Sequence, residues 1–252
     1  MLYGNTSIAH YTSRNLFIWF TMAFQAGLLN IGGYLVARKI VSHVTGFATF
    51  FGHDVALGLG EEALGMLVVP CFFLLGSMLS GYFVDVRLKL GKRPKYYITF
   101  GLMFFLNLVI FLVGIMGGWG EFGQYPLELE AYILLIILCF LCGVQNGTIS
   151  TVSKSVVRTT HLTGITTDLG LGIMRMIYYS RLKDKLSDEG QANFMRIGII
   201  FSFVFGSVVG GVLFHRFEYF GFILPLIISG SLFFLMMYFQ VWRAQVKALP
   251  EP

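Results

Sequence analysis

Six long apolar stretches dominate this sequence and leave few alternatives for its fold. They cover residues 15–37, 62–84, 96–117, 131–150, 197–214 and 220–241. A helix that crosses a membrane needs about 20 predominantly apolar residues, and each stretch is close to that length or longer. Only 12% of the 252 residues are charged, which is too few to cover a soluble fold of this size. The sequence therefore predicts an all-α integral membrane protein with six transmembrane helices.

The length and the pattern of the apolar stretches define the domain organisation. The stretches are continuous rather than alternating, which excludes a transmembrane β-barrel. Six spans leave no room for a separate soluble domain, so residues 1–252 are expected to form a single membrane domain. The sequence contains no P-loop, GxSxG or HExxH motif, and no cofactor, bound metal or catalytic residue is expected.

The loops differ sharply in charge, and this difference predicts the topology. Segment 85–95 contains five Lys or Arg residues, whereas segment 118–130 contains three Glu and no Lys or Arg. Because cytoplasmic loops are rich in Lys and Arg, the first is expected inside and the second outside. Six spans with both termini in the cytoplasm place 15 Lys and Arg inside and three outside.

Two segments, 40–58 and 155–175, are too polar for lipid-facing helices and too apolar for solvated loops. If both crossed the membrane fully, ten Lys and Arg would lie inside and eight outside, which is a much weaker bias. They are therefore expected to insert only in part, as discontinuous, re-entrant or interfacial segments.

The same two segments carry an internal repeat. Residues 42–52 align without gaps on residues 160–170, with His, Thr, Gly, Thr and Gly identical, and Gly27 to Asn30 matches Gly143 to Asn146. The chain is thus expected to be a duplication with halves of about 1–125 and 126–252. Each half has three spans, so the second enters the membrane in the opposite sense and forms an inverted repeat.

Inverted repeats bind substrate near the midplane, between the halves and on discontinuous segments. The polar segments follow the first span of each half, and we interpret them as lining such a site. The alternative is that their Gly and Thr residues serve close helix packing alone. The residues expected to bind substrate are Asn30, His43, Thr45, Gly46, Thr49, Gln145, Asn146, Arg158, His161, Thr163, Gly164 and Thr167.

Asp168 is the expected coupling residue, because it is an acidic group in an otherwise uncharged stretch and ionisable groups at membrane depth are usually functional. The alternative is an interfacial carboxylate paired with Arg158 or Arg175. The equivalent histidines, His43 and His161, are able to carry protons near neutral pH or to serve as hydrogen-bonded packing residues.

The leading hypothesis is a small secondary transporter or facilitator that moves a small polar or anionic solute by alternating access. An intramembrane enzyme or lipid-handling protein and a passive channel remain alternatives. The expected partners are a small-molecule solute and membrane lipid, and not nucleic acid. Small residues at 76–77 and 80–81 suit close helix contact, either inside the protein or in a homodimer.

The sequence also resembles the YoaK-like family of uncharacterised bacterial inner-membrane proteins. The resemblance covers essentially the whole chain and is most specific in Gly143 to Gly147, Arg158 to Thr160 and Leu162 to Gly164. Asn30 and Phe47 stand where this family usually has Asp and Asn. The resemblance implies a multi-pass protein of the bacterial inner membrane, and it implies no established activity.

Overall fold

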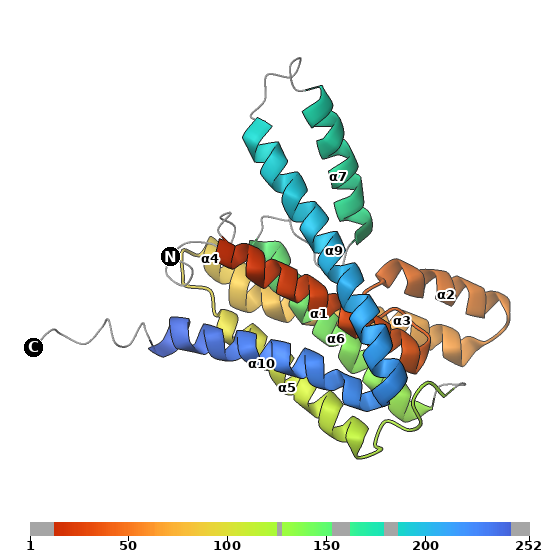
Figure 1. Ribbon diagram of the computed structural model, residues 1–252. Helices are drawn as coiled ribbons and strands as arrows, with labels where there is room; N and C mark the ends of the chain where they lie inside the picture. The colour runs from red at the N-terminus through yellow and green to blue at the C-terminus, as the bar shows by residue number, and fades with distance from the viewer. Residues whose placement is uncertain (1–12, 125–127, 153–161, 179–185, 243–252) are drawn as a thin grey trace, which may run out of the picture.

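The computed structural model describes residues 13–124, 128–152, 162–178 and 186–242, and all regular structure within these ranges is helical (Figure 1). The α-helices are α1 (Ser13–Ala37), α2 (Val44–Ala56), α3 (Gly60–Gly81), α4 (Arg87–Lys89), α5 (Tyr96–Ile115), α6 (Leu129–Val152), α7 (Leu162–Ile177), α9 (Leu186–Phe217) and α10 (Ile223–Met237). The π-helices η1 (Tyr82–Val86) and η3 (Tyr238–Trp242) continue α3 and α10, and the 3-10 helix η2 (Glu218–Phe222) joins α9 to α10.

Five helical stretches of the described residues are long and apolar enough to cross a membrane. The first four are Asn15–Ala37, Gly60–Lys89, Tyr96–Ile115 and Leu129–Ile149, and they match the first four predicted spans. The fifth, Glu189–Trp242, is 54 residues long and contains both α9 and α10. These stretches are the pattern of a multi-pass membrane protein.

Helix α9 is longer than the sequence predicted. It starts at Leu186, well before the predicted span 197–214, and its 32 residues correspond to about 48 Å at 1.5 Å per residue. The hydrocarbon core of a membrane is only about 30 Å thick. Consistent with this excess length, α7 and the first turns of α9 extend together away from the other helices (Figure 1).

Helices α1 and α9 make one of the two most extensive contacts between helices of the described chain. Glycines allow their backbones to touch: a side chain on Gly27 would collide with the carbonyl oxygen of Phe203, and one on Gly206 with that of Phe24. The hydroxyl of Ser207 donates a hydrogen bond of 3.4 Å to the Gly27 carbonyl. Small residues at the crossing replace side-chain contacts by direct backbone contact, which is common between membrane helices.

Helices α3 and α6 make the second extensive contact, and it has the same construction. A side chain on Gly76 would collide with the Phe140 carbonyl oxygen, and one on Gly143 with the Phe73 carbonyl oxygen. The Ser77 hydroxyl donates a hydrogen bond of 3.2 Å to the Gly143 carbonyl. The small residues of α3 therefore serve a contact inside the protein.

The two short helices pack on the long ones. Helix α2 packs on α3, and α7 packs on α9, as Figure 1 shows. Helix α2 buries Phe47 and Asp54, whereas α7 buries Ile165 and Gly172. The repeat alignment pairs Phe47 with Ile165, and continued without a gap it pairs Asp54 with Gly172. Both short helices thus bury the same two aligned positions.

The core consists of two separate apolar clusters. The Trp19 cluster joins buried residues of α1, α5, α6, α7, α9 and α10, among them Met22, Met103 and Leu232. The Phe214 cluster joins other parts of α1, α5, α6 and α9 to α2 and α3. Buried polar side chains lie near the level where the clusters meet.

Candidate functional site

Buried polar residues lie near the level where three long helices pass from one apolar cluster to the other. On α1 the change falls between Ala23 and Leu29, on α5 between Met103 and Ile110, and on α6 between Cys142 and Val144. Gln25 and Asn107 lie inside these intervals, Gln145 and Asn146 directly follow Val144, and Ser229 of α10 contacts Asn107. We call these five residues the polar layer.

Gln145 connects α6 to α1 across this layer. Its side-chain Nε2 donates a hydrogen bond of 2.8 Å to the carbonyl oxygen of Met22. A backbone carbonyl only accepts hydrogen bonds, so this contact determines which way the amide points. The other amide atom, Oε1, is buried and finds no partner among the described residues. Gln145 therefore presents an unused acceptor inside the core.

Asn107 makes the equivalent connection between α5 and α10. Its Nδ2 donates to the Met103 carbonyl at 2.9 Å and to the Ser229 hydroxyl at 3.2 Å. Ser229 in turn donates to the Pro225 carbonyl at 2.8 Å. The Asn107 Oδ1 atom is buried without a partner in the described chain, so a second amide acceptor is left unused.

Gln25 and Asn146 complete the layer. Gln25 is the middle residue of α1 and is fully buried, yet neither its Oε1 nor its Nε2 has a partner among the described residues. Asn146 is 7% exposed, and its Oδ1 is likewise unpartnered there. A buried amide without a hydrogen bond destabilises a fold by about 1–3 kcal/mol. Several such groups are therefore costly, and they make the polar layer the candidate site.

The first-half residues expected to bind substrate lie near the start of α2. The side-chain Oδ1 of Asn30 accepts a hydrogen bond of 3.1 Å from the backbone N–H of Ser42, so Asn30 holds the segment between α1 and α2. His43 is exposed, and its ring lies over the backbone of Gly46.

The threonines of both segments are exposed and behave alike. Thr49 donates to the Thr45 carbonyl at 3.1 Å, and Thr167 donates to the Thr163 carbonyl at 3.0 Å. Such bonds back to the same helix satisfy the hydroxyl without a ligand. Asp168 is also exposed, and within the described residues Arg175 pairs with a different carboxylate.

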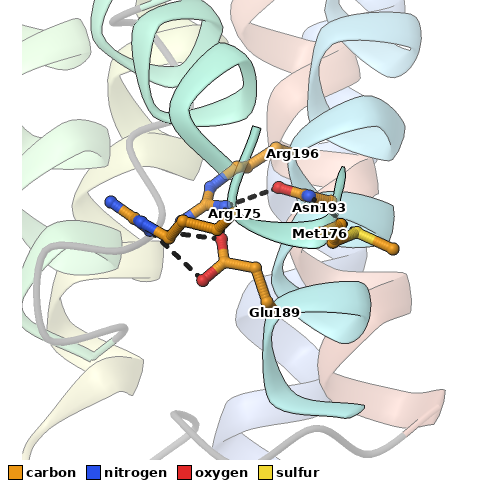
Figure 2. Close-up of polar contacts among 5 residues, drawn as sticks. All are labelled: Arg175, Met176, Glu189, Asn193 and Arg196. Carbon is orange, nitrogen blue, oxygen red and sulfur yellow. Dashed lines mark hydrogen bonds and ion pairs between the residues drawn. The ribbon is translucent and has the colours of Figure 1, made fainter. Parts of the chain in front are cut away.

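That carboxylate belongs to Glu189, the centre of a charged cluster between α7 and α9. Figure 2 shows Arg175 of α7 reaching Glu189, with a closest distance of 3.2 Å. Arg196 Nη1 lies 2.9 Å from Glu189 Oε1 and 2.6 Å from Asn193 Oδ1. Asn193 also donates to the sulfur of Met176 at 3.2 Å. This cluster is the main polar contact that attaches α7 to α9.

Gly172 makes this cluster possible. A side chain on Gly172 would collide with Asn193, Glu189 and Arg196 together, so the α7 backbone itself covers the charged groups. Burial of Arg196 is then tolerable because its charge is paired and hydrogen-bonded.

A second charged group lies at the other short helix. Asp54 of α2 is largely buried and lies 3.0 Å from the exposed His53 ring. Lys39 lies over the Phe50 ring at 3.7 Å, and burial lowers the pKa of Lys39, while the Asp54 carboxylate opposes this shift. These contacts lie at the middle and the C-terminal end of α2, and none of them involves its threonines.

The structure thus divides the predicted site residues into separate groups. Gln145 and Asn146 lie in the polar layer, and Asn30 contacts Ser42 just before α2. His43, Gly46 and the threonines of both segments lie at or along α2 and α7. These two helices pack on different long helices. Arg158 and His161 lie outside the described residues, whereas Gly164 is half-buried in α7.

Three polar-layer residues were not among the predicted site residues: Gln25, Asn107 and Ser229. A signal for Gln25 and Asn107 was present, because a lone amide in the middle of an apolar span is unusual. It did not distinguish a bridge between helices from a substrate contact, since nothing in a sequence shows whether a buried amide has partners.

The fold and these contacts define the class: a multi-pass helical membrane protein with a buried polar layer between its long helices. Residues 18–238 match DUF1275, which is described as a protein of unknown function. The chain belongs to this family. The YoaK-like resemblance is consistent with that assignment. Comparison with curated proteins and with solved structures found no significant match.

Proposed function

We propose that this protein is a small transporter of the bacterial inner membrane that carries a small polar or anionic solute by alternating access. The observation that carries the proposal is the polar layer, in which four buried side chains hold five unpartnered amide atoms among the described residues. Polar groups deep in membrane helices are costly and mark solute pathways.

The proposed architecture is an inverted repeat of two three-helix halves with six crossings. Its support is the pair of equivalent helix contacts: the crossing built on Gly27 and Gly206 has the same glycine, carbonyl and serine arrangement as the one built on Gly143 and Gly76. In each, the first helix of one half packs on the second long helix of the other half. Rocking of such halves about a central site is the usual mechanism of alternating access.

In this proposal both termini are cytoplasmic, and labelling tests that topology. Cysteine is introduced at Lys92 or at Glu128 after the exposed Cys71 is replaced by alanine. A membrane-impermeant maleimide should label the Lys92→Cys protein only from the cytoplasm and the Glu128→Cys protein only from outside. Permeabilised cells, in which both react, are the control. Labelling of both from one side would contradict the inverted arrangement.

We further propose that Asp168 couples or gates transport and that the exposed threonines of α2 and α7 line the entrances to the site. Asp168→Asn keeps the shape and hydrogen bonding of the side chain but removes its charge. It should strongly slow solute uptake, with unfolding unchanged. Asp54→Asn, in the other short helix, is the matched control. Normal uptake by the Asp168 variant would reduce Asp168 to an interfacial charge.

A further inference from the structure

We infer that the polar layer binds an uncharged solute that both donates and accepts hydrogen bonds. This inference rests on the proposed transport function and names the class of its substrate. It concerns Gln25, Asn107, Gln145 and Asn146, which come from three helices, and it assigns Gln25 and Asn107 a binding role that the sequence did not suggest.

The unpartnered atoms determine what the solute must supply. Gln145 Oε1 and Asn107 Oδ1 are acceptors whose orientation is set by the bonds that their amide nitrogens donate to backbone carbonyls. Together with Asn146 Oδ1 and Gln25 Oε1 they form four buried acceptors without donors in the described chain. A solute with several N–H or O–H groups satisfies them.

The charge of the layer disfavours ions of both signs. An anion would face these four acceptors and would meet no Lys or Arg, since all five layer residues are uncharged. A cation would face the unpartnered Nε2 donor of Gln25 and would find no carboxylate to balance its charge. An uncharged solute avoids both costs, because burying an unpaired charge is far more unfavourable than burying a hydrogen-bonded dipole.

Because the layer is buried, a solute bound there would be closed off from both sides of the membrane in this state. Gln25, Asn107 and Gln145 are fully buried, so a solute reaches them only when the halves move. This agrees with alternating access, in which a central site is closed to both sides in one state.

Purified protein in liposomes tests the inference with four probes: urea and erythritol, which are uncharged, phosphate, which is an anion, and methylammonium, which is a cation. Wild-type protein should accelerate saturable entry of urea or erythritol over protein-free liposomes. Gln25→Met, which keeps the length of the side chain, and Asn107→Leu should each reduce that entry at least tenfold. Thr99→Val is the matched control, because the buried Thr99 hydroxyl lies outside the layer and is satisfied by the Tyr96 carbonyl at 3.1 Å, and its uptake should be unchanged.

Stability gives an independent readout. Removing an unsatisfied amide should raise the unfolding midpoint of Gln25→Met by roughly 2–4 °C, whereas a lower midpoint in both amide variants would show that the amides are structural and would overturn the inference. Entry of phosphate or methylammonium alone would overturn the uncharged class and leave the transport function intact. Entry of none of the four probes would contradict the transport function itself, and the inference with it.

Discussion

The contact of α2 with α3 and the contact of α7 with α9 are two versions of one design that differ in where their charge lies. In α2 the buried position after Phe47 is Asp54, a charged residue of the short helix itself. In α7 the equivalent position is Gly172, and the charges come from the long helix as Glu189 and Arg196.

The apolar position and the charged position of the two contacts behave differently. The apolar position is occupied by Phe47 on one short helix and by Ile165 on the other, and each is buried in a core cluster. The charged side chain stands on the short helix in one contact and on the long helix in the other. Gly172 leaves room on α7 for the side chains of α9, so the two contacts share an apolar position and differ in their electrostatics.

The largest loss of stability is expected from removing the Glu189 carboxylate, which lies at the centre of the contact between α7 and α9. Glu189→Ala leaves the mostly buried Arg196 without its carboxylate and should destabilise the protein by about 3 kcal/mol. Asp54→Ala removes the partner of the exposed His53 and a negative charge near Lys39, and it should cost less than about 1 kcal/mol. Unfolding in mixed micelles measures both. Equal losses would contradict the view that the two contacts differ electrostatically.

The two long-helix crossings should respond alike, which sharpens the comparison. Gly206→Ala and Gly76→Ala each place a methyl group against a backbone carbonyl and should each destabilise the protein by about 2 kcal/mol. Gly211→Ala and Gly81→Ala are the controls, since neither new methyl group would have a close neighbour. Unfolding midpoints of the four variants provide the test. Tolerance of alanine at only one crossing would argue against equivalent copies.

The smallest effect on stability is expected at the exposed threonines. Thr45→Val and Thr163→Val nearly preserve volume, and each should change the free energy of unfolding by no more than about 0.5 kcal/mol. If α2 and α7 both line the solute path, each variant should nevertheless slow uptake into liposomes. Unchanged uptake in one variant alone would assign the path to the other short helix, whereas unchanged uptake in both would remove these segments from it.

The sequence alone determined the class of fold and much of the local structure. Continuous apolar stretches can be stable only as helices in a membrane, so the helical class and the first four spans were predictable. The repeat between residues 42–52 and 160–170 predicted two equivalent short segments, and the structure forms a helix in each from Val44 and from Leu162. These properties depend on residues close together in the chain.

Only the tertiary structure decided which polar residues share a site and which have partners. Gln25 and Gln145 look alike in the sequence, yet one has no hydrogen-bond partner in the described chain and the other donates to Met22. Likewise, nothing local predicts that Arg175 pairs with Glu189 rather than with Asp168, which lies two turns away on the same helix. Hydrogen-bond satisfaction depends on the distance and direction between atoms far apart in the chain, and those are determined only when the long helices pack.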